Sequence, residues 1–178
     1  MADWGPWLGS DPHAVLRHVL RHEVDTTGLA LEFGVATGGT LRMIAAHMRA
    51  VGFDSFDGLP ELWRAGFPAG MFACEPPDVP GAQIVVGRFA DTLPGWVLAN
   101  PDATVTLVHI DCDLYESTRT VLAHAPIRPG CVVVLDEHHG YPGWEAHEAR
   151  AWAETDIAHT VIGHGPEQLA VRVEETLW

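Results

Sequence analysis

The stretch Leu29–Thr40, LALEFGVATGGT, predicts a buried strand that ends at a glycine-rich turn and continues into a helix. The apolar residues before Gly34 are typical of a parallel strand that is covered on both faces. Gly34, Gly38 and Gly39 allow a sharp turn and a close approach to a ligand, because glycine has no Cβ. Near the end of the strand, the carboxylate of Glu32 can hold a charged or hydroxyl-bearing group. The stretch therefore predicts one half of a site for a nucleotide-like cofactor.

Predicted strands and helices alternate along the rest of the chain. Further strands are expected at residues 51–54, 82–86, 105–110, 131–135, 159–163 and 169–173. Helices are expected between them, among others at residues 39–50 and 143–154. The short spacing of the last two strands predicts a hairpin, and therefore an antiparallel edge. This order predicts an α/β fold with a doubly wound, mostly parallel, Rossmann-like sheet and an antiparallel C-terminal hairpin strand.

The length of 178 residues predicts a single domain over residues 1–178. Residues 1–27 are expected to form an N-terminal arm and a helix. Residues 55–80 are rich in glycine, proline and aromatic side chains, including Trp63 and Phe67. A loop of this length inside a compact domain is usually functional or disordered. Its aromatic content favours a packed lid over a site.

The composition limits the class of partner. The chain has 24 acidic residues against 10 basic ones, all of them arginine, and a formal net charge of −14. Nucleic acids and anionic membranes require positive surfaces, so we expect a small molecule and a divalent cation as partners instead. Cys74, Cys112 and Cys131 have no CxxC spacing, which is typical of free thiols in a reducing compartment. With no apolar run of about 20 residues and no signal peptide, a cytoplasmic protein is expected.

The residues that follow the predicted parallel strands should converge, because ligands of open α/β sheets bind at the carboxyl ends of the strands. These residues are the glycine turn, Asp54, Arg88–Phe89, Asp111 and Asp136–Glu137. Asp54 lies about 20 residues after Gly34, the distance at which a βαβ unit returns an acid to the ribose of a nucleotide-like cofactor.

Three carboxylates, Asp111, Asp136 and Glu137, end two strands that should be neighbours. Carboxylates that meet at one point repel one another unless a cation lies between them, and oxygen ligands select a hard ion such as Mg²⁺. The alternative is that Asp136 and Glu137 are solvated at a strand end. For Asp113 we expect an N-cap of the next helix, with Glu116 completing a capping box.

Histidines near these carboxylates are candidates for a general base. His138 and His139 follow the second acidic pair, and an imidazole there could accept the proton of a hydroxyl group. His139 is slightly preferred, although a plain loop position suits both equally well. His109 lies within an apolar strand, so a hydrogen-bonded core histidine is the favoured interpretation for it.

Several motifs together resemble a known family. Glu32–Gly38, EFGVATG, looks like motif I of class I S-adenosylmethionine-dependent methyltransferases. More specific are the stretches GFDSFDGLPE at 52–61, HIDCDLYEST at 109–118 and PGCVVVLDE at 129–137. In combination they resemble the macrocin O-methyltransferase (TylF/MycF-like) family, which methylates sugar hydroxyls on macrolides and related natural products. The resemblance runs from about residue 29 to residue 152.

The resemblance implies a seven-stranded Rossmann-like sheet and a Mg²⁺-dependent methyl transfer from S-adenosylmethionine to a hydroxyl group. The implied cofactor-binding residues are Glu32, Gly34, Thr37, Gly38, Thr40, Asp54, Ser55, Phe56, Arg88, Phe89 and Asp111. The implied metal ligands are Asp111, Asp136 and Glu137, and the catalytic candidates are His139, His138 and Asp111. A homodimer is also plausible from the family and from the many tryptophans, including Trp178.

The sequence departs from the family pattern at three points. Ala36 replaces the middle glycine of motif I, and Glu137 stands where many relatives have aspartate. Related catechol-type enzymes place a lysine base three residues after the first metal acid, where this chain has Leu114. The chain has no lysine at all, which returns weight to a histidine base.

Two other functions are compatible with parts of the sequence. Gly34, Ala36 and Gly39 also occupy GxGxxG positions, and Asp54 would suit the ribose of NAD, so an NAD-dependent oxidoreductase is one alternative. Against it, the chain has no Tyr-x-x-x-Lys pair, and the acidic cluster would be unexplained. The other alternative is a non-catalytic cofactor-binding scaffold of the same fold, which the intact acidic cluster disfavours.

Overall fold

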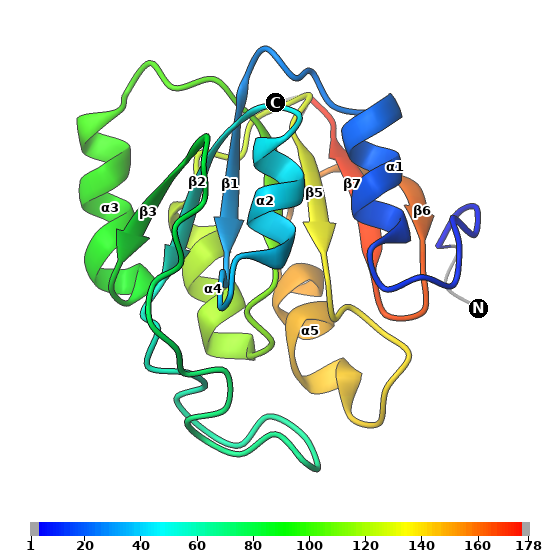
Figure 1. Ribbon diagram of the computed structural model, residues 1–178. Coiled ribbons are helices and arrows are strands. Elements are labelled where there is room, and N and C mark those ends of the chain that lie inside the picture. The colour runs from blue at the N-terminus through cyan, green and yellow to red at the C-terminus, as the bar shows by residue number, and fades with distance from the viewer. Residues whose placement is uncertain (1–3, 176–178) are drawn as a thin grey trace.

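The computed structural model describes residues 4–175 and contains one mixed sheet between two layers of helices (Figure 1). The strands are β1 Leu29–Phe33, β2 Arg49–Asp54, β3 Ala82–Val86, β4 Val105–Ile110, β5 Val132–Leu135, β6 His159–His164 and β7 Leu169–Val173. Their order across the sheet is β3-β2-β1-β4-β5-β7-β6. The first five strands run parallel, and β7 pairs antiparallel with both β5 and β6. The predicted fold class is therefore confirmed.

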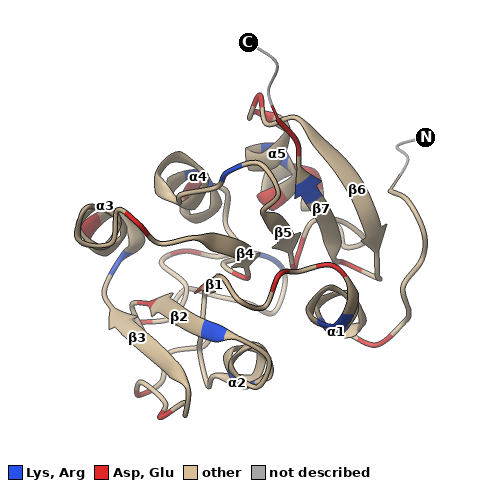
Figure 2. Ribbon diagram, turned by 90° about the horizontal axis from the view of Figure 1, so that it is seen from above, with Lys and Arg blue, Asp and Glu red and all other residues tan. Residues whose placement is uncertain are grey.

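Helices cover both faces of the sheet (Figure 2). They are α1 Ala14–His22, α2 Gly39–Ala45, α3 Phe89–Ala99, α4 Tyr115–His124 and α5 Glu148–Ala153, with a short 3-10 turn η1 at Trp144–Ala146. Helices α1 and α2 lie on one face and α3, α4 and α5 on the other. Each face has its own apolar core, because the parallel strands present apolar side chains to both sides.

Two predicted helices are shorter in the structure. The helix expected at 39–50 ends at Ala45, because β2 begins at Arg49 and pairs in register with the whole of β1. The helix expected at 143–154 is split at His147, where a ψ of −121° breaks the helical path between η1 and α5.

The segment 55–80, all of it described, forms turns and bends without a helix or a strand. Its apolar side chains form a third cluster in which Leu59 and Trp63 pack with Leu114 and Tyr141. Figure 1 shows this segment beyond the carboxyl ends of β1 and β5, where the site was expected. The segment is therefore packed against the body of the protein, and we call residues 55–80 the lid after the role predicted for them.

The N-terminal arm lies along the outer strand of the sheet. The backbone N–H of Leu8 donates to the carbonyl of His164 at 2.9 Å, and the N–H of His164 donates to the carbonyl of Pro6 at 3.0 Å. Residues 1–3 of the predicted arm and the terminal Trp178 lie outside the described residues. In the described part of the chain, no helix is long and apolar enough to cross a membrane.

Candidate functional site

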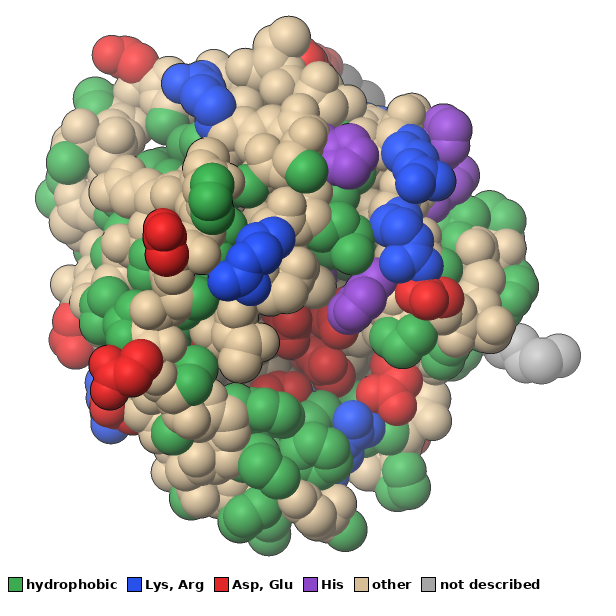
Figure 3. Space-filling model, in the orientation of Figure 1, with side chains coloured by type: hydrophobic (Ala, Val, Ile, Leu, Met, Phe, Trp, Pro, Cys, Tyr) green, Lys and Arg blue, Asp and Glu red, His purple; other side chains and the backbone are tan. Residues whose placement is uncertain are grey.

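A cleft of about 960 Å³ opens at the carboxyl ends of the parallel strands. In Figure 3 a group of acidic side chains lies at the bottom of a hollow in the middle of the molecule, beside apolar side chains. The predicted site residues that line the cleft are Gly34, Thr37, Asp54, Ser55, Arg88, Phe89, Asp111 and Glu137. Residues from the ends of β1, β2, β4 and β5, and from the turn after β3, therefore meet at one place.

The glycine turn depends on a close backbone contact at Gly34 and on hydrogen bonds to Asp54. Gly34 has a φ of 94°, and a Cβ built on it would lie 1.7 Å from the carbonyl oxygen of Asp111. Ala36 adopts a φ of 43°, which is uncommon for a residue with a side chain. The carboxylate Oδ2 of Asp54 accepts the backbone N–H groups of Val35 and Ala36, both at 2.8 Å. The end of β2 thus fixes the turn that follows β1.

Asp54 has a second contact on the other side of its carboxylate. Its Oδ1 accepts the backbone N–H of Phe56 at 2.8 Å, so the same side chain also fixes the start of the lid. Each carboxylate oxygen can accept more than one hydrogen bond. Asp54 lines the cleft as predicted, and its role toward a ribose stays a prediction.

Four of the predicted cofactor-binding residues are not among those that line the cleft. Glu32 is fully buried beneath the turn, and Thr40 and Phe56 are buried in the core. Gly38, with a φ of 79°, is the N-cap of α2, where a Cβ would lie 2.9 Å from a methyl group of Val79.

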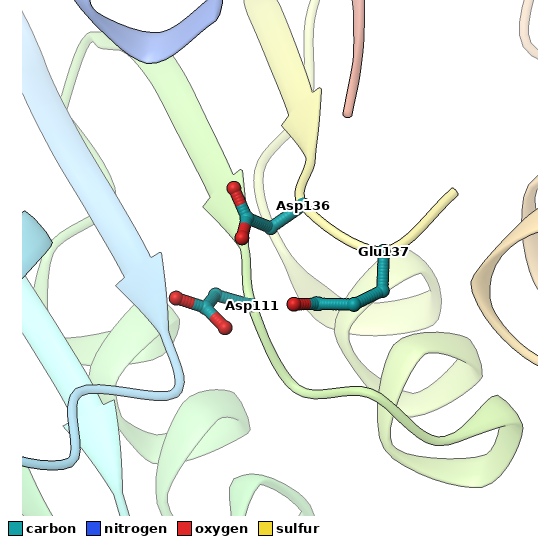
Figure 4. A group of neighbouring side chains, drawn as sticks. All are labelled: Asp111, Asp136 and Glu137. Carbon is teal, nitrogen blue, oxygen red and sulfur yellow. The ribbon is translucent and has the colours of Figure 1, made fainter. Parts of the chain in front are cut away.

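The three predicted metal ligands come together. Asp111 follows β4, Asp136 and Glu137 follow β5, and their side chains point toward one another (Figure 4). One carboxylate oxygen from each lies within 4.8 Å of the others. Burial, together with the negative charge of Asp136, raises the pKa of both Asp111 and Glu137 well above the ordinary value. The three carboxylates therefore repel one another, and a positive charge between them would relieve this repulsion.

Two atoms of this cluster bear on whether it suits a cation. Oε2 of Glu137 is buried without a hydrogen-bond partner among the described residues, and buried Oδ1 of Asp136 has only a long, 3.5 Å contact with Nε2 of His109. A buried carboxylate oxygen without a partner is costly, and a hard divalent cation takes oxygen ligands of this kind. The residues present thus fit a Mg²⁺-like ion, which Asp111, Asp136 and Glu137 would hold.

Asp113 does not cap a helix, so that prediction is wrong. Helix α4 begins at Tyr115 after Leu114, without a side-chain cap, and the carboxylate of Glu116 pairs with Arg119 at 2.8 Å instead. Asp113 has a φ of 63° and its side chain lines the cleft, although it is only 7% exposed. Burial raises its pKa to about 7, and the nearby charge of Arg64 opposes the shift.

Three non-glycine residues that line the cleft have a strained backbone conformation with a positive φ. Ala36, Phe72 and Asp113 line the cleft and have φ angles of 43°, 70° and 63°. Non-glycine residues in this conformation cost free energy and persist only where their surroundings enforce it, often at functional sites. The sequence carried no signal for these conformations, because each residue type is compatible with ordinary backbone geometry.

Arg64 belongs to the lid and lines the cleft near the acidic residues. Its guanidinium lies 3.9 Å from the ring centre of Trp63 and 4.4 Å from that of Tyr141, and its Nη1 donates to Glu167 at 3.1 Å. The contacts therefore join the lid to the loop after β5 and to the loop between β6 and β7. Sequence reasoning found the aromatic residues of the lid and missed this arginine.

Glu148 is a second residue that sequence reasoning missed. It is fully buried at the start of α5, and its Oε2 accepts the backbone N–H of Glu137 at 3.1 Å. Burial raises the pKa of Glu148 to about 8. This side chain therefore fixes the backbone of a metal-ligand candidate. An acid in the first turn of a short helix gave no sign of its burial.

His109 is buried, as predicted for a core histidine. Its Nδ1 lies 2.9 Å from Oε1 of Glu32, and its Nε2 lies 3.5 Å from Oδ1 of Asp136. Burial by itself lowers the pKa of His109, but the contacts with Asp136 and Glu32 outweigh it and hold the pKa well above the ordinary value. His109 therefore connects the residue beneath the glycine turn with the acidic cluster.

The two candidate histidine bases lie elsewhere. His139 stacks on Trp4, with 4.1 Å between the ring centres, and its Nε2 donates to the carbonyl of Gly165 at 3.1 Å. His138 contacts Trp144 and His139, and burial lowers its pKa to about 4. Neither histidine is among the residues that line the cleft. His139 contacts the N-terminal arm and the loop between β6 and β7, and His138 contacts the arm and η1. The role of either histidine as a base stays a prediction.

Comparisons with known proteins agree with this geometry. A family model described as a methyltransferase domain matches residues 31–138, well over half of the chain. A crystal structure of the calicheamicin methyltransferase CalS11 is 26% identical, with a TM-score of 0.70 over 90% of this chain and 76% of that one. Another structure of CalS11, called a TDP-rhamnose 3'-O-methyltransferase, is 25% identical with a TM-score of 0.63, over the same shares of the two chains. A search of curated proteins found no match.

More distant structures share the fold. The O-methyltransferase NovP is 20% identical, with a TM-score of 0.64 over 92% of this chain and 78% of that one. An O-methyltransferase from Bacillus cereus, solved with S-adenosylhomocysteine (SAH), is 14% identical, with a TM-score of 0.54 over 96% of this chain and 84% of that one.

Proposed function

Since the chain belongs to the methyltransferase-domain family, we propose that it moves a methyl group from S-adenosylmethionine to a hydroxyl group of a small molecule. The observation that carries this proposal is the meeting of two features in one cleft. The turn at Gly34 lies at the end of β1, and Asp111 of the acidic cluster touches it through its backbone at the end of β4.

The glycine turn and its neighbours form the cofactor half of the cleft. Gly34 and Thr37 line the cleft after β1, and Asp54 and Ser55 line it at the end of β2. Arg88 and Phe89 line it beyond β3, where the ring of Phe89 packs edge-to-face on Phe33. This is the end of the sheet at which nucleotide-like ligands bind. When bound there, S-adenosylmethionine would supply an electrophilic methyl group on a sulfonium that is already a good leaving group.

The acidic cluster forms the acceptor half. Asp111, Asp136 and Glu137 are the residues that would hold a divalent cation. Such an ion would polarise a hydroxyl oxygen and lower its pKa. The contribution of the chain itself is to fix these carboxylates, through the backbone contact of Glu137 with Glu148 and the neighbouring position of Asp111 beside Gly34.

Asp113 is our candidate for the group that accepts the hydroxyl proton. It lines the cleft two residues after Asp111 and is not part of the group of three carboxylates that converge. A general base must lie within hydrogen-bond reach of the proton it removes. The histidines predicted for this role contact Trp4 of the N-terminal arm and do not line the cleft, whereas Asp113 lines it together with Asp111 and Glu137.

The acceptor that we propose is a sugar or polyol hydroxyl of a natural product. Support comes from CalS11, whose solved structure is described as that of a TDP-rhamnose 3'-O-methyltransferase and is 25% identical to this chain. The lid offers aromatic surfaces at the cleft, from Trp63, Phe67 and Phe72, that suit the apolar face of a sugar ring. Acidic residues provide hydrogen-bond acceptors for its hydroxyl groups.

Calorimetric titration with SAH, NAD⁺ and Mg²⁺ tests the proposal. We expect SAH to bind at one site and NAD⁺ not to bind, and we expect EDTA to abolish methyl transfer to nucleotide-sugar acceptors until Mg²⁺ is restored. Binding of NAD⁺ alone would instead favour an oxidoreductase. Binding of SAH without transfer to any acceptor of a broad sugar panel, with Asp136→Ala changing no measured property, would favour a scaffold.

A further inference from the structure

Three buried polar side chains form a row across the middle of the sheet. Glu32 of β1 is the register partner of His109 of β4, so both side chains lie on the same face. Val134 of β5 is the register partner of His109, and Asp136 follows two residues later on that face, because side chains alternate along a strand. The face is the one covered by α1 and α2. Three separate strands therefore contribute one continuous polar chain to an apolar layer.

Bulk solvent does not reach Glu32 or His109, because both are fully buried. The imidazole is 2.9 Å from Glu32 Oε1 and 3.5 Å from Asp136 Oδ1, so it lies between two carboxylates. Oε2 of Glu32 and Nε2 of His109 have no hydrogen-bond partner that satisfies normal geometry among the described residues. Buried polar groups are expected to be satisfied. The contact between Nε2 and Oδ1 of Asp136 is thus longer than a normal hydrogen bond, and a small shift of Asp136 toward the imidazole would make it one.

The two ends of this row belong to different halves of the cleft. Glu32 comes two residues before Gly34, on the strand that delivers the glycine turn. Asp136 is one of the three carboxylates whose oxygens converge. A change in the position of either carboxylate would change a contact of the same imidazole, that of His109. His109 itself does not line the cleft, so it acts only through its two neighbours.

We propose that His109 is a positioning residue that links the cofactor half of the cleft to the cation half, so that occupancy of one half raises the affinity of the other. The inference rests on the proposed function, because it assigns a cation to the acidic cluster and SAH to the glycine turn. Such coupling is reciprocal, and typical allosteric couplings change affinity by about 5–150-fold. A histidine that merely fills the core would fix the fold without coupling the two sites.

Two substitutions test the two ring nitrogens of His109 separately. In His109→Asn, the amide nitrogen reaches the position of Nδ1, which keeps the bond to Glu32 and removes the contact with Asp136. In His109→Gln, the amide nitrogen reaches farther, which keeps the contact with Asp136 and loses the bond to Glu32. His124→Asn at the exposed end of α4 is the matched control. Circular dichroism and thermal unfolding establish that each variant is folded.

Binding of Mn²⁺, followed by its electron paramagnetic resonance signal with and without SAH, gives the readout. In the parent and in His124→Asn, we expect SAH to tighten Mn²⁺ binding about 5-fold or more. In His109→Asn, we expect weaker Mn²⁺ binding and loss of the SAH effect. In His109→Gln, we expect Mn²⁺ binding without SAH to return to within about 2-fold of the parent, with the SAH effect still absent.

The possible failures are distinct. A parent protein that binds neither SAH nor Mn²⁺ contradicts the proposed function and the coupling with it. A parent that binds both independently, or a His109→Asn variant that keeps the full SAH effect, overturns the role of His109 and leaves the proposed function standing. If the His109 variants do not fold, Glu32→Gln replaces them. That change lies outside the carboxylate group of Asp111, Asp136 and Glu137 and should still reduce the effect of SAH on Mn²⁺ binding.

Discussion

Gly34 and Asp111 touch through their backbones at the centre of the cleft. A Cβ on Gly34 would lie 1.7 Å from the carbonyl oxygen of Asp111, closer than any real contact. Gly34 belongs to the turn proposed for the cofactor, and Asp111 belongs to the carboxylates proposed for a cation. The missing side chain at Gly34 therefore allows the two halves of the site to be adjacent.

Gly34→Ala should destabilise the protein by more than about 3 kcal/mol and abolish SAH binding, since it adds a steric clash to a φ of 94°. The matched control is Ala36→Gly in the same turn. Ala36 already has a φ of 43°, so glycine there should change the free energy of unfolding by no more than about 1 kcal/mol. Urea unfolding measures both. Equal effects of the two substitutions would contradict the steric account.

Asp113→Asn should lower kcat for methyl transfer by about 10²-fold or more, the usual contribution of a general base. Its affinity for SAH should stay within about 2-fold of the parent, because Asp113 is proposed to act on the acceptor hydroxyl and not on the cofactor. His139→Asn is the comparison, since it tests the base predicted from the sequence. A large loss of kcat in His139→Asn with none in Asp113→Asn would reverse the assignment.

Arg64→Gln should raise KM for the acceptor with less effect on kcat. The guanidinium packs on Trp63 and Tyr141 and pairs with Glu167, so its loss releases the lid from the body of the protein. Arg64→Lys should not restore the parent KM, because an ammonium group cannot lie flat over the rings of Trp63 and Tyr141 as the planar guanidinium does. Arg21→Gln, at the exposed end of α1, is the control. An unchanged KM in Arg64→Gln would mean that the lid is held by its apolar contacts alone.

The metal-free protein should lose stability as the pH rises from about 5 to about 8. Burial raises the pKa of Asp113 to about 7 and that of Glu148 to about 8, from ordinary values of 3.8 and 4.5. Groups with a raised folded pKa stabilise the fold fully below their unfolded pKa, and this contribution is lost as the pH approaches the folded value. Thermal unfolding in EDTA should therefore show a Tm that falls across this range.

The same titration with Mg²⁺ provides the control. Because a cation favours the ionised carboxylates, the stabilisation that Mg²⁺ gives should grow with pH over the same range. In Asp136→Asn the effect of Mg²⁺ should shrink at every pH. A Tm in EDTA that rises between pH 5 and pH 8 would show that the buried acids are already ionised in the fold.

The sequence was sufficient for the sheet and for most of the residues that meet at the cleft. Strand ends are predictable because apolar runs stop at Gly34, Asp54 and Asp111, and parallel strands place their carboxyl ends together. The metal-ligand candidates followed from the same rule. Helix boundaries were less accurate, because the pairing of β2 from Arg49 onward overrode the helical pattern of the preceding residues.

What the sequence did not reveal depends on contacts between distant residues. Asp113 has a favourable spacing for a capping box, but it adopts a φ of 63° and lines the cleft, and α4 begins after Leu114 without a side-chain cap. The sequence around Glu148 and Arg64 does not indicate their roles, because each depends on a residue elsewhere in the chain. Glu148 contacts Glu137, and Arg64 contacts Glu167. His139 looked like a base from its position beside the acids, and its stacking on the N-terminal arm is a tertiary contact.

A crystal structure with SAH and Mn²⁺ tests the central claim most directly. The account predicts SAH against the turn at Gly34, and one anomalous manganese peak about 2.1–2.4 Å from carboxylate oxygens of Asp111, Asp136 and Glu137. A structure with SAH in the cleft and no manganese at these carboxylates would contradict the cation-assisted reaction. SAH bound away from the glycine turn would contradict the site itself.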